Sequence, residues 1–151
     1  MPDFLPGSYT FDYYHFNDHE LWNNGIITAM SLHCGTDSFA IRVQYDGIKW
    51  SPWRGCSVHI CNDNILFDRN ITFDHDEHIV SADVGETSTF VRGFAFTTNK
   101  RKLQTCGQLY PNETRTESGG RLEYISGMDS YSGWFLPQLQ LHWSDQFTHV
   151  G

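Results

Sequence analysis

Residues 38–45 read SFAIRVQY, and this stretch decides the fold class. Large apolar side chains alternate along it with small or polar ones. Because successive side chains of a β-strand point to opposite faces of the sheet, the alternation predicts a strand with one buried face. The side chains expected on the buried face are Phe39, Ile41, Val43 and Tyr45.

The same period of two recurs along the chain. It is clear at 121–124 and 138–143, and similar strands are expected at 8–16, 26–33, 57–61, 65–73, 78–84 and 89–97. Short polar turn sequences, such as Asn24-Gly25 and Asp46-Gly47, separate these segments. No window of a dozen residues shows the 3.6-residue period of a helix, so very little helix is expected. The pattern predicts an all-β fold, built as a sandwich, a barrel or a prism.

The composition is that of a folded domain. The 151 residues include five Trp, seven Tyr and eleven Phe, and only 19% are charged, which argues against disorder. The length fits one domain, expected over residues 1–151. A net charge of −8 opposes attraction to nucleic acid and to anionic membranes. No apolar run is long enough for membrane insertion.

Cysteines and glycosylation sequons indicate the compartment. The chain has four cysteines, Cys34, Cys56, Cys61 and Cys106, and two sequons, at Asn70 and Asn112. Together they predict a secreted, extracellular glycoprotein with disulfides, although free core thiols and chance sequons are the alternative. The three possible disulfide pairings stay open. The first residues, MPDFLPGS, lack the regions of a secretory signal, so any signal is expected to have been removed.

Neither a metal site nor a catalytic site is expected. The stretch 74–78, Asp-His-Asp-Glu-His, lacks the spacing of a calcium loop and is interpreted as a solvated turn. Cys56 and Cys61 match no structural zinc spacing. Motifs such as Gly-x-Ser-x-Gly and His-Glu-x-x-His do not occur. We therefore expect no cofactor and no enzyme.

Four phrases occur in an order that is found in one family. They are IRVQYDG at 41–47, FAFTTN at 94–99, LEYISG at 122–127 and LQLHW at 139–143. In this order they resemble the jacalin-related lectin domain, and the animal zymogen-granule branch is the nearest relative suggested. The resemblance covers about residues 20 to 144. It implies a β-prism I fold, with three four-stranded antiparallel sheets around a pseudo-threefold axis.

The resemblance also implies a carbohydrate site in loops at one end of the prism. That site normally combines a Gly-Gly loop near the start, a recognition loop after the Thr-Asn strand end, and a Gly-x-x-x-Asp loop near the end. A carboxylate there accepts hydrogen bonds from sugar hydroxyls, and an aromatic face covers the sugar ring. In this chain, Pro137 takes the place of the aspartate, and residues 15–20 show no Gly-Gly pair.

A longer final loop offers replacements for the missing groups. In the loop from Gly127 to Gly133, Asp129 is expected to substitute for the absent acid. An exposed turn without ligand, prism-end packing of the aromatic residues and a solvated basic tip at 100–102 are the alternatives. The candidate carbohydrate-binding residues are Asp129, Ser130, Tyr131, Gly133, Trp134, Phe135, Lys100 and Lys102.

We expect a secreted lectin that binds glycans or glycoproteins without chemical change. Single sites of modest affinity gain avidity in an oligomer, and a homodimer is the commonest closed form. The alternative is an extracellular structural protein with a degenerate sugar site, whose acidic surface contacts a mineral surface.

Overall fold

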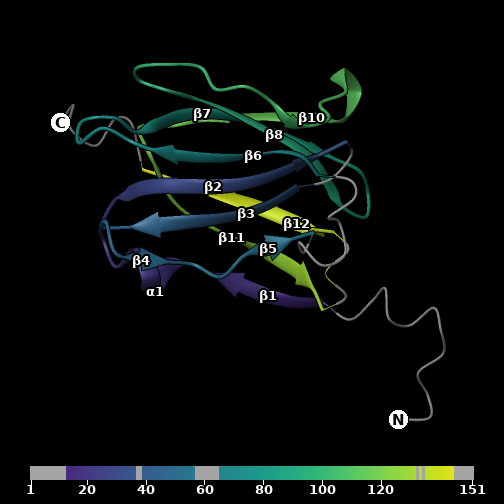
Figure 1. Ribbon diagram of the computed structural model, residues 1–151, viewed down its shortest axis with the longest axis horizontal. Helices are drawn as coiled ribbons and strands as arrows, with labels where there is room; N and C mark the ends of the chain where they lie inside the picture. The colour runs from purple at the N-terminus through teal and green to yellow at the C-terminus, as the bar shows by residue number, and fades with distance from the viewer. Residues whose placement is uncertain (1–12, 37–38, 57–64, 132, 134, 145–151) are drawn as a thin grey trace, which may run out of the picture.

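The computed structural model describes residues 13–36, 39–56, 65–131, 133 and 135–144 (Figure 1). They form three antiparallel sheets. Helix is confined, within these ranges, to α1 (His19–Trp22) and a 3-10 turn at Pro111–Glu113. The sequence-based prediction of an all-β chain with very little helix is therefore confirmed.

Each sheet draws on distant parts of the chain. The first sheet has the order β1 (Tyr13–Asn17), β11 (Leu122–Ser130), β12 (Gln138–Trp143). The second has β4 (Lys49–Trp50) and β5 (Arg54–Gly55) beside β3 (Phe39–Tyr45), then β2 (Ile27–Gly35) and β6 (Ile65–Thr72). The third has β10 (Thr114–Ser118), β7 (Ile79–Glu86), β8 (Val91–Thr98) and β9 (Cys106–Gly107).

The number of strands differs from four in two of the sheets. In the second sheet, the short strands β4 and β5 both pair with β3, so together they fill one strand position. The first sheet has three strands within the described ranges. The expected strand at 8–16 is described only from Tyr13 onward, and the one at 57–61 lies outside the described residues.

The core confirms the alternation from which the fold class was predicted. Phe39, Ile41, Val43 and Tyr45 are each no more than 1% exposed. They pack with buried apolar side chains of the other two sheets, among them Ile125 and Leu139 of the first and Val84 and Phe94 of the third. Each such side chain contributes roughly 1.5–3 kcal/mol when it is fully buried.

A buried ion pair joins the first two sheets. Asp18, which follows β1, is fully buried and lies 2.8 Å from the Arg54 guanidinium of β5. The Tyr45 hydroxyl donates to the same carboxylate at 2.8 Å. Desolvation and the nearby Asp18 charge raise the pKa of Tyr45, which keeps its hydroxyl a hydrogen-bond donor.

A disulfide joins the second and third sheets. Cys34 of β2 is bonded to Cys106 of β9, and both are fully buried. Cys56 is also disulfide-bonded, and Cys61 lies outside the described residues. A loop of 72 residues closed in this way stabilises the fold by about 4 kcal/mol in the chain-entropy estimate. None of the helices described is long and apolar enough to cross a membrane.

Strand direction determines which loops meet at each end of the molecule. Strand β7 ends at Glu86 and β8 begins at Val91, and Val91 pairs with Leu136. The segment 87–90 and the described residues of 131–137 therefore lie at one end, which we call the rim end (right in Figure 1). Segments 73–78 and 99–102 lie at the opposite end, which we call the far end, where the backbone N–H of Asn99 donates to the His78 carbonyl.

Candidate functional site

Asp129 is a buried structural carboxylate. Strand β11 continues to Ser130 and pairs with β1, so that Tyr14 lies opposite Asp129. Asp129 is 4% exposed and accepts hydrogen bonds from the Tyr14 hydroxyl (2.9 Å), the Gly55 amide (3.1 Å) and the Ser130 amide (2.8 Å). Its expected place in an exposed rim loop is therefore wrong, because the strand is longer than the sequence indicated.

The electrostatics of Asp129 fit this structural role. Burial raises the pKa of its carboxyl, while the three hydrogen-bond donors and Arg54 act in the opposite direction. Burial and the contact with Asp129 raise the pKa of the Tyr14 hydroxyl to about 12. Ser130 is likewise 4% exposed. Neither side chain faces solvent, and the Asp129 carboxylate holds β11 against Tyr14 of β1 and Gly55 of β5.

The other predicted residues of the 127–137 segment have mixed positions. Tyr131 is 71% exposed, and its ring lies 4.7 Å from that of Tyr14. Gly133 has a φ of 75°, a conformation that favours glycine. Phe135 is half-buried and meets Tyr13 and Phe90 edge to face. Trp134 lies outside the described residues.

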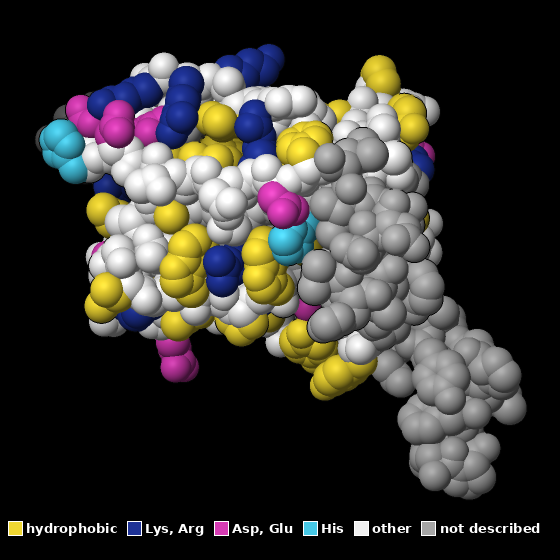
Figure 2. All heavy atoms as spheres, viewed as in Figure 1, with side chains coloured by type: hydrophobic (Ala, Val, Ile, Leu, Met, Phe, Trp, Pro, Cys, Tyr) yellow, Lys and Arg dark blue, Asp and Glu magenta, His cyan; other side chains and the backbone are white. Residues whose placement is uncertain are grey.

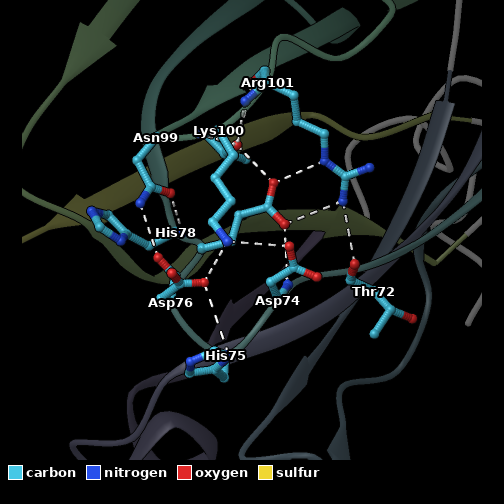
Figure 3. A network of polar contacts seen from close by, with 10 residues as sticks. Thr72, Asp74, His75, Asp76, His78, Asn99, Lys100 and Arg101 are labelled. Carbon is cyan, nitrogen blue, oxygen red and sulfur yellow. Dashed lines mark hydrogen bonds and ion pairs between the residues drawn. The ribbon is translucent and has the colours of Figure 1, made fainter.

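The basic segment 100–102 lies at the far end and is held by acidic side chains (Figure 3). The Lys100 ammonium contacts Asp74 at 3.3 Å and also pairs with Asp76. Arg101 donates to the Glu77 carboxylate at 2.8 Å. The Arg101 contact lowers the pKa of Glu77 to about 2. This network joins two turns, in agreement with a turn at 74–78. Within it, the charges of Lys100 and Arg101 are paired with carboxylates.

The structure therefore separates the two groups of predicted site residues. Lys100 and Lys102 are at the far end, whereas Tyr131, Gly133 and Phe135 are at the rim end. The expectation that both groups form one site is wrong, because β8 runs from the rim end to the far end before it reaches Lys100. A loop that shares the rim end with the described residues of 131–137 is 87–90, Thr-Ser-Thr-Phe.

A pocket of about 410 Å³ lies between the two rim loops. Its lining residues are Tyr13, Glu86, Thr87, Ser88, Thr89, Met128, Pro137 and Gln138. Pro137, which takes the aspartate position of the resembling family, is thus part of this pocket. It supplies neither a carboxylate nor a backbone N–H.

The geometry of the 87–90 loop leaves some hydroxyls exposed. The Thr87 hydroxyl accepts the amides of Thr89 and Phe90, each at 3.1 Å, and so is used to hold the turn. Ser88 and Thr89 are exposed. Glu86, at the base of the loop, is half-buried and lies 3.4 Å from Arg115. The pocket therefore offers hydroxyls, an amide, a carboxylate and an aromatic ring.

A shallow groove continues from this pocket along the edges of two sheets. It has a volume of about 520 Å³ and shares Glu86 and Gln138 with the rim pocket. Arg115 of β10 spans it and donates to the Leu139 carbonyl of β12 at 2.6 Å. The groove thus separates the edge strands of the first and third sheets.

Sequence reasoning missed the 87–90 loop. The Thr-Ser-Thr run between two predicted strands is the signal that marks it, because three successive hydroxyl side chains at a strand end are available for polar contacts. The stretch 15–20, interpreted as the position of a missing Gly-Gly loop, is instead the end of β1, the buried Asp18 and the start of α1.

The two sequons lie on the surface. Asn70 is exposed on β6, and its side-chain oxygen accepts from Ser31 at 2.9 Å. Asn112 is exposed in the 3-10 turn. Among the residues that the structure describes, no three His, Cys, Asp or Glu side chains are grouped as metal ligands.

Comparison with solved structures identifies the fold. No family model matches the sequence, and no curated protein matches it. Solved structures do match: a prostate-specific WGA16 glycoprotein lectin has a TM-score of 0.58 at 17% identity, covering 88% of this chain and 90% of that one. The Calsepa lectin in complex with bisected glycan has a TM-score of 0.62 at 14% identity, covering 88% and 89%.

Wild-type Malaysian banana lectin is similar to the same extent, with a TM-score of 0.62 at 16% identity, covering 86% of this chain and 87% of that one. The chain therefore has the β-prism fold of the jacalin-related lectins, as the resemblance implied. The chain thus shares its fold with these lectins.

Proposed function

We propose that this protein is a secreted lectin that binds glycans in the rim pocket without chemical change. One observation carries the proposal: on a fold shared with lectins, the pocket between the 87–90 and 131–137 loops has exposed hydroxyls at Ser88 and Thr89. Sugars are recognised by a few placed polar groups together with an aromatic contact. Of the residues first expected to bind sugar, Tyr131, Gly133 and Phe135 remain candidates at this end, and Trp134, which lies outside the described residues, remains a candidate from the sequence.

Glu86 takes the role of the acid that Pro137 removes. A carboxylate forms strong hydrogen bonds with sugar hydroxyls, and Glu86 is the carboxylate that lines the pocket. Arg115 contacts this carboxylate at 3.4 Å and so orients it. The Tyr13 ring supplies the apolar contact. Single-site affinity should lie between millimolar and micromolar, about −4 to −8 kcal/mol.

A glycan array with matched variants tests this proposal. The double variant Ser88→Ala, Thr89→Val removes the two exposed hydroxyls, and Glu86→Gln removes the charge. Lys102→Ala at the far end is the control. Loss of array binding in the rim variants, with binding kept in the control, supports the proposal. Equal binding by all variants would refute it.

Secretion, glycosylation at Asn70 and Asn112, and a homodimer belong to the same proposal. The buried Cys34–Cys106 disulfide supports an oxidising compartment. Both asparagines are accessible to a transferase. Sedimentation of the secreted protein, before and after enzymatic removal of glycans, measures the glycan mass and the number of subunits.

A further inference from the structure

The outer face of the second sheet has an aromatic and basic stack. The Arg42 guanidinium lies between two indole rings, 4.3 Å from Trp50 and 5.0 Å from Trp53. On its other side, Trp53 stacks on His33 at 4.0 Å, and His33 contacts Asp68 at 2.6 Å. We call these five residues the sheet-face stack. Figure 2 shows a basic side chain between two hydrophobic ones near the middle of this face.

Arg42 is one of the arginines that have no carboxylate partner among the described residues, and its guanidinium lies between two indole rings. Arg54, Arg92, Arg101 and Arg115 each lie within 3.4 Å of a carboxylate. Among the described residues, the Arg42 side chain has no hydrogen bond or ion pair, and its buried Nε lacks an acceptor. The two terminal Nη groups of Arg42 also have no acceptor among the described residues, and they are not buried, so they can receive a carboxylate from outside.

The surroundings of Arg42 define the acceptor. A guanidinium fork binds a carboxylate through two parallel hydrogen bonds, and the flanking indoles restrict the access of water, which strengthens them. Trp50 and Trp53 are each 36% exposed, so their uncovered parts can contact the C–H groups of a sugar ring. Asp68, with a side chain 58% exposed, and the net charge of −8 oppose a highly charged polyanion.

We propose that the sheet-face stack is a second binding site, for a sugar that carries a single carboxylate. Arg42 holds the carboxylate, and Trp50 and Trp53 contact the ring. The stack shares no residue with the rim pocket, so this site is independent of the proposed rim function. The carboxylate belongs either to a sialic acid at a glycan terminus or to a uronic acid.

Calorimetric titration with three probes tests the proposal and separates the two sources. The probes are 3′-sialyllactose, a glucuronic-acid disaccharide and neutral lactose. The wild-type protein should bind one of the two acidic probes at least tenfold more tightly than lactose. The acidic probe that shows the preference identifies the source.

Variants then assign the preference to Arg42. Arg42→Gln should abolish the preference, and Arg42→Lys, which keeps charge and bulk, should reduce it because the planar fork is lost. The Ser88→Ala, Thr89→Val variant should retain it. Near-ultraviolet circular dichroism checks folding, and Arg42→Lys serves if the glutamine variant does not fold. The proposal is overturned if wild-type protein shows no acidic preference, if the Arg42 variants keep it, or if the rim variant loses it.

Discussion

The two ends of the prism use polar residues in opposite ways. At the far end, Lys100 and Arg101 are paired with Asp74, Asp76 and Glu77, and the contacts join two turns (Figure 3). At the rim end, hydroxyls of the 87–90 loop remain exposed beside a pocket. Charge density alone therefore does not mark a binding site. Exposed polar groups that line a concave surface are the better sign.

The largest expected effect is on stability and concerns Asp129. The sequence placed this carboxylate in a rim loop, whereas the structure buries it in β11. Asp129→Ala should lower the free energy of unfolding by about 3 kcal/mol, because it leaves two buried amides and the partly buried Tyr14 hydroxyl without an acceptor. Urea denaturation measures this. Ser88→Ala, an exposed change at the same end, is the control and should stay within about 0.5 kcal/mol. A neutral effect of Asp129→Ala would contradict its structural role.

At the far end, removing a paired charge should affect stability and not binding. Glu77→Gln should lower the free energy of unfolding by about 2 kcal/mol, because the Glu77 side chain is 1% exposed and holds Arg101 and Thr98. Glycan binding should be unchanged. Asp76→Asn removes a more exposed carboxylate and should cost less. Loss of glycan binding in Glu77→Gln would contradict the claim that the far end contributes to stability and not to binding.

Acid should weaken the far end first. The pKa of Glu77 is about 2 in the folded protein, against an ordinary value of 4.5. A depressed folded pKa gives stability that is fully present above pH 4.5 and is lost as the pH falls toward 2. The contribution amounts to about 3 kcal/mol at most. Stability curves from pH 6 to pH 2 should be shallower for Glu77→Gln than for wild-type protein; parallel curves would contradict this.

The smallest expected effect is a change in glycan affinity at the rim end. Pro137→Asp places a carboxylate in the pocket at the position where the resembling family has one. Affinity for neutral glycans should rise a few-fold, and stability should change by less than about 1 kcal/mol, because Pro137 is only half-buried. Titration with the best array glycan measures the change. Weaker binding than wild type would show that Glu86 alone suits this pocket.

The sequence predicted the strands better than it predicted which loops come together at each end of the prism. The period of two identified the buried faces of 39–45 and 138–143, since alternation is a local property of a strand. Which loops share an end depends on strand direction and sheet membership, so Lys100 was placed wrongly beside 131–137. The strand position of Asp129 has no local signal, because it depends on the pairing of β1 with β11 as far as Ser130. The pairing of Arg42 with two indoles is likewise non-local.

The most direct test of the account maps the glycan on the protein. Isotope-labelled protein titrated with the strongest neutral glycan from the array should show amide shifts at Ser88, Thr89 and Gln138. The amides of Lys100, Arg101 and Lys102 should not move. Shifts confined to 99–102, with a silent 87–90 loop, would contradict the assignment of binding to the rim end.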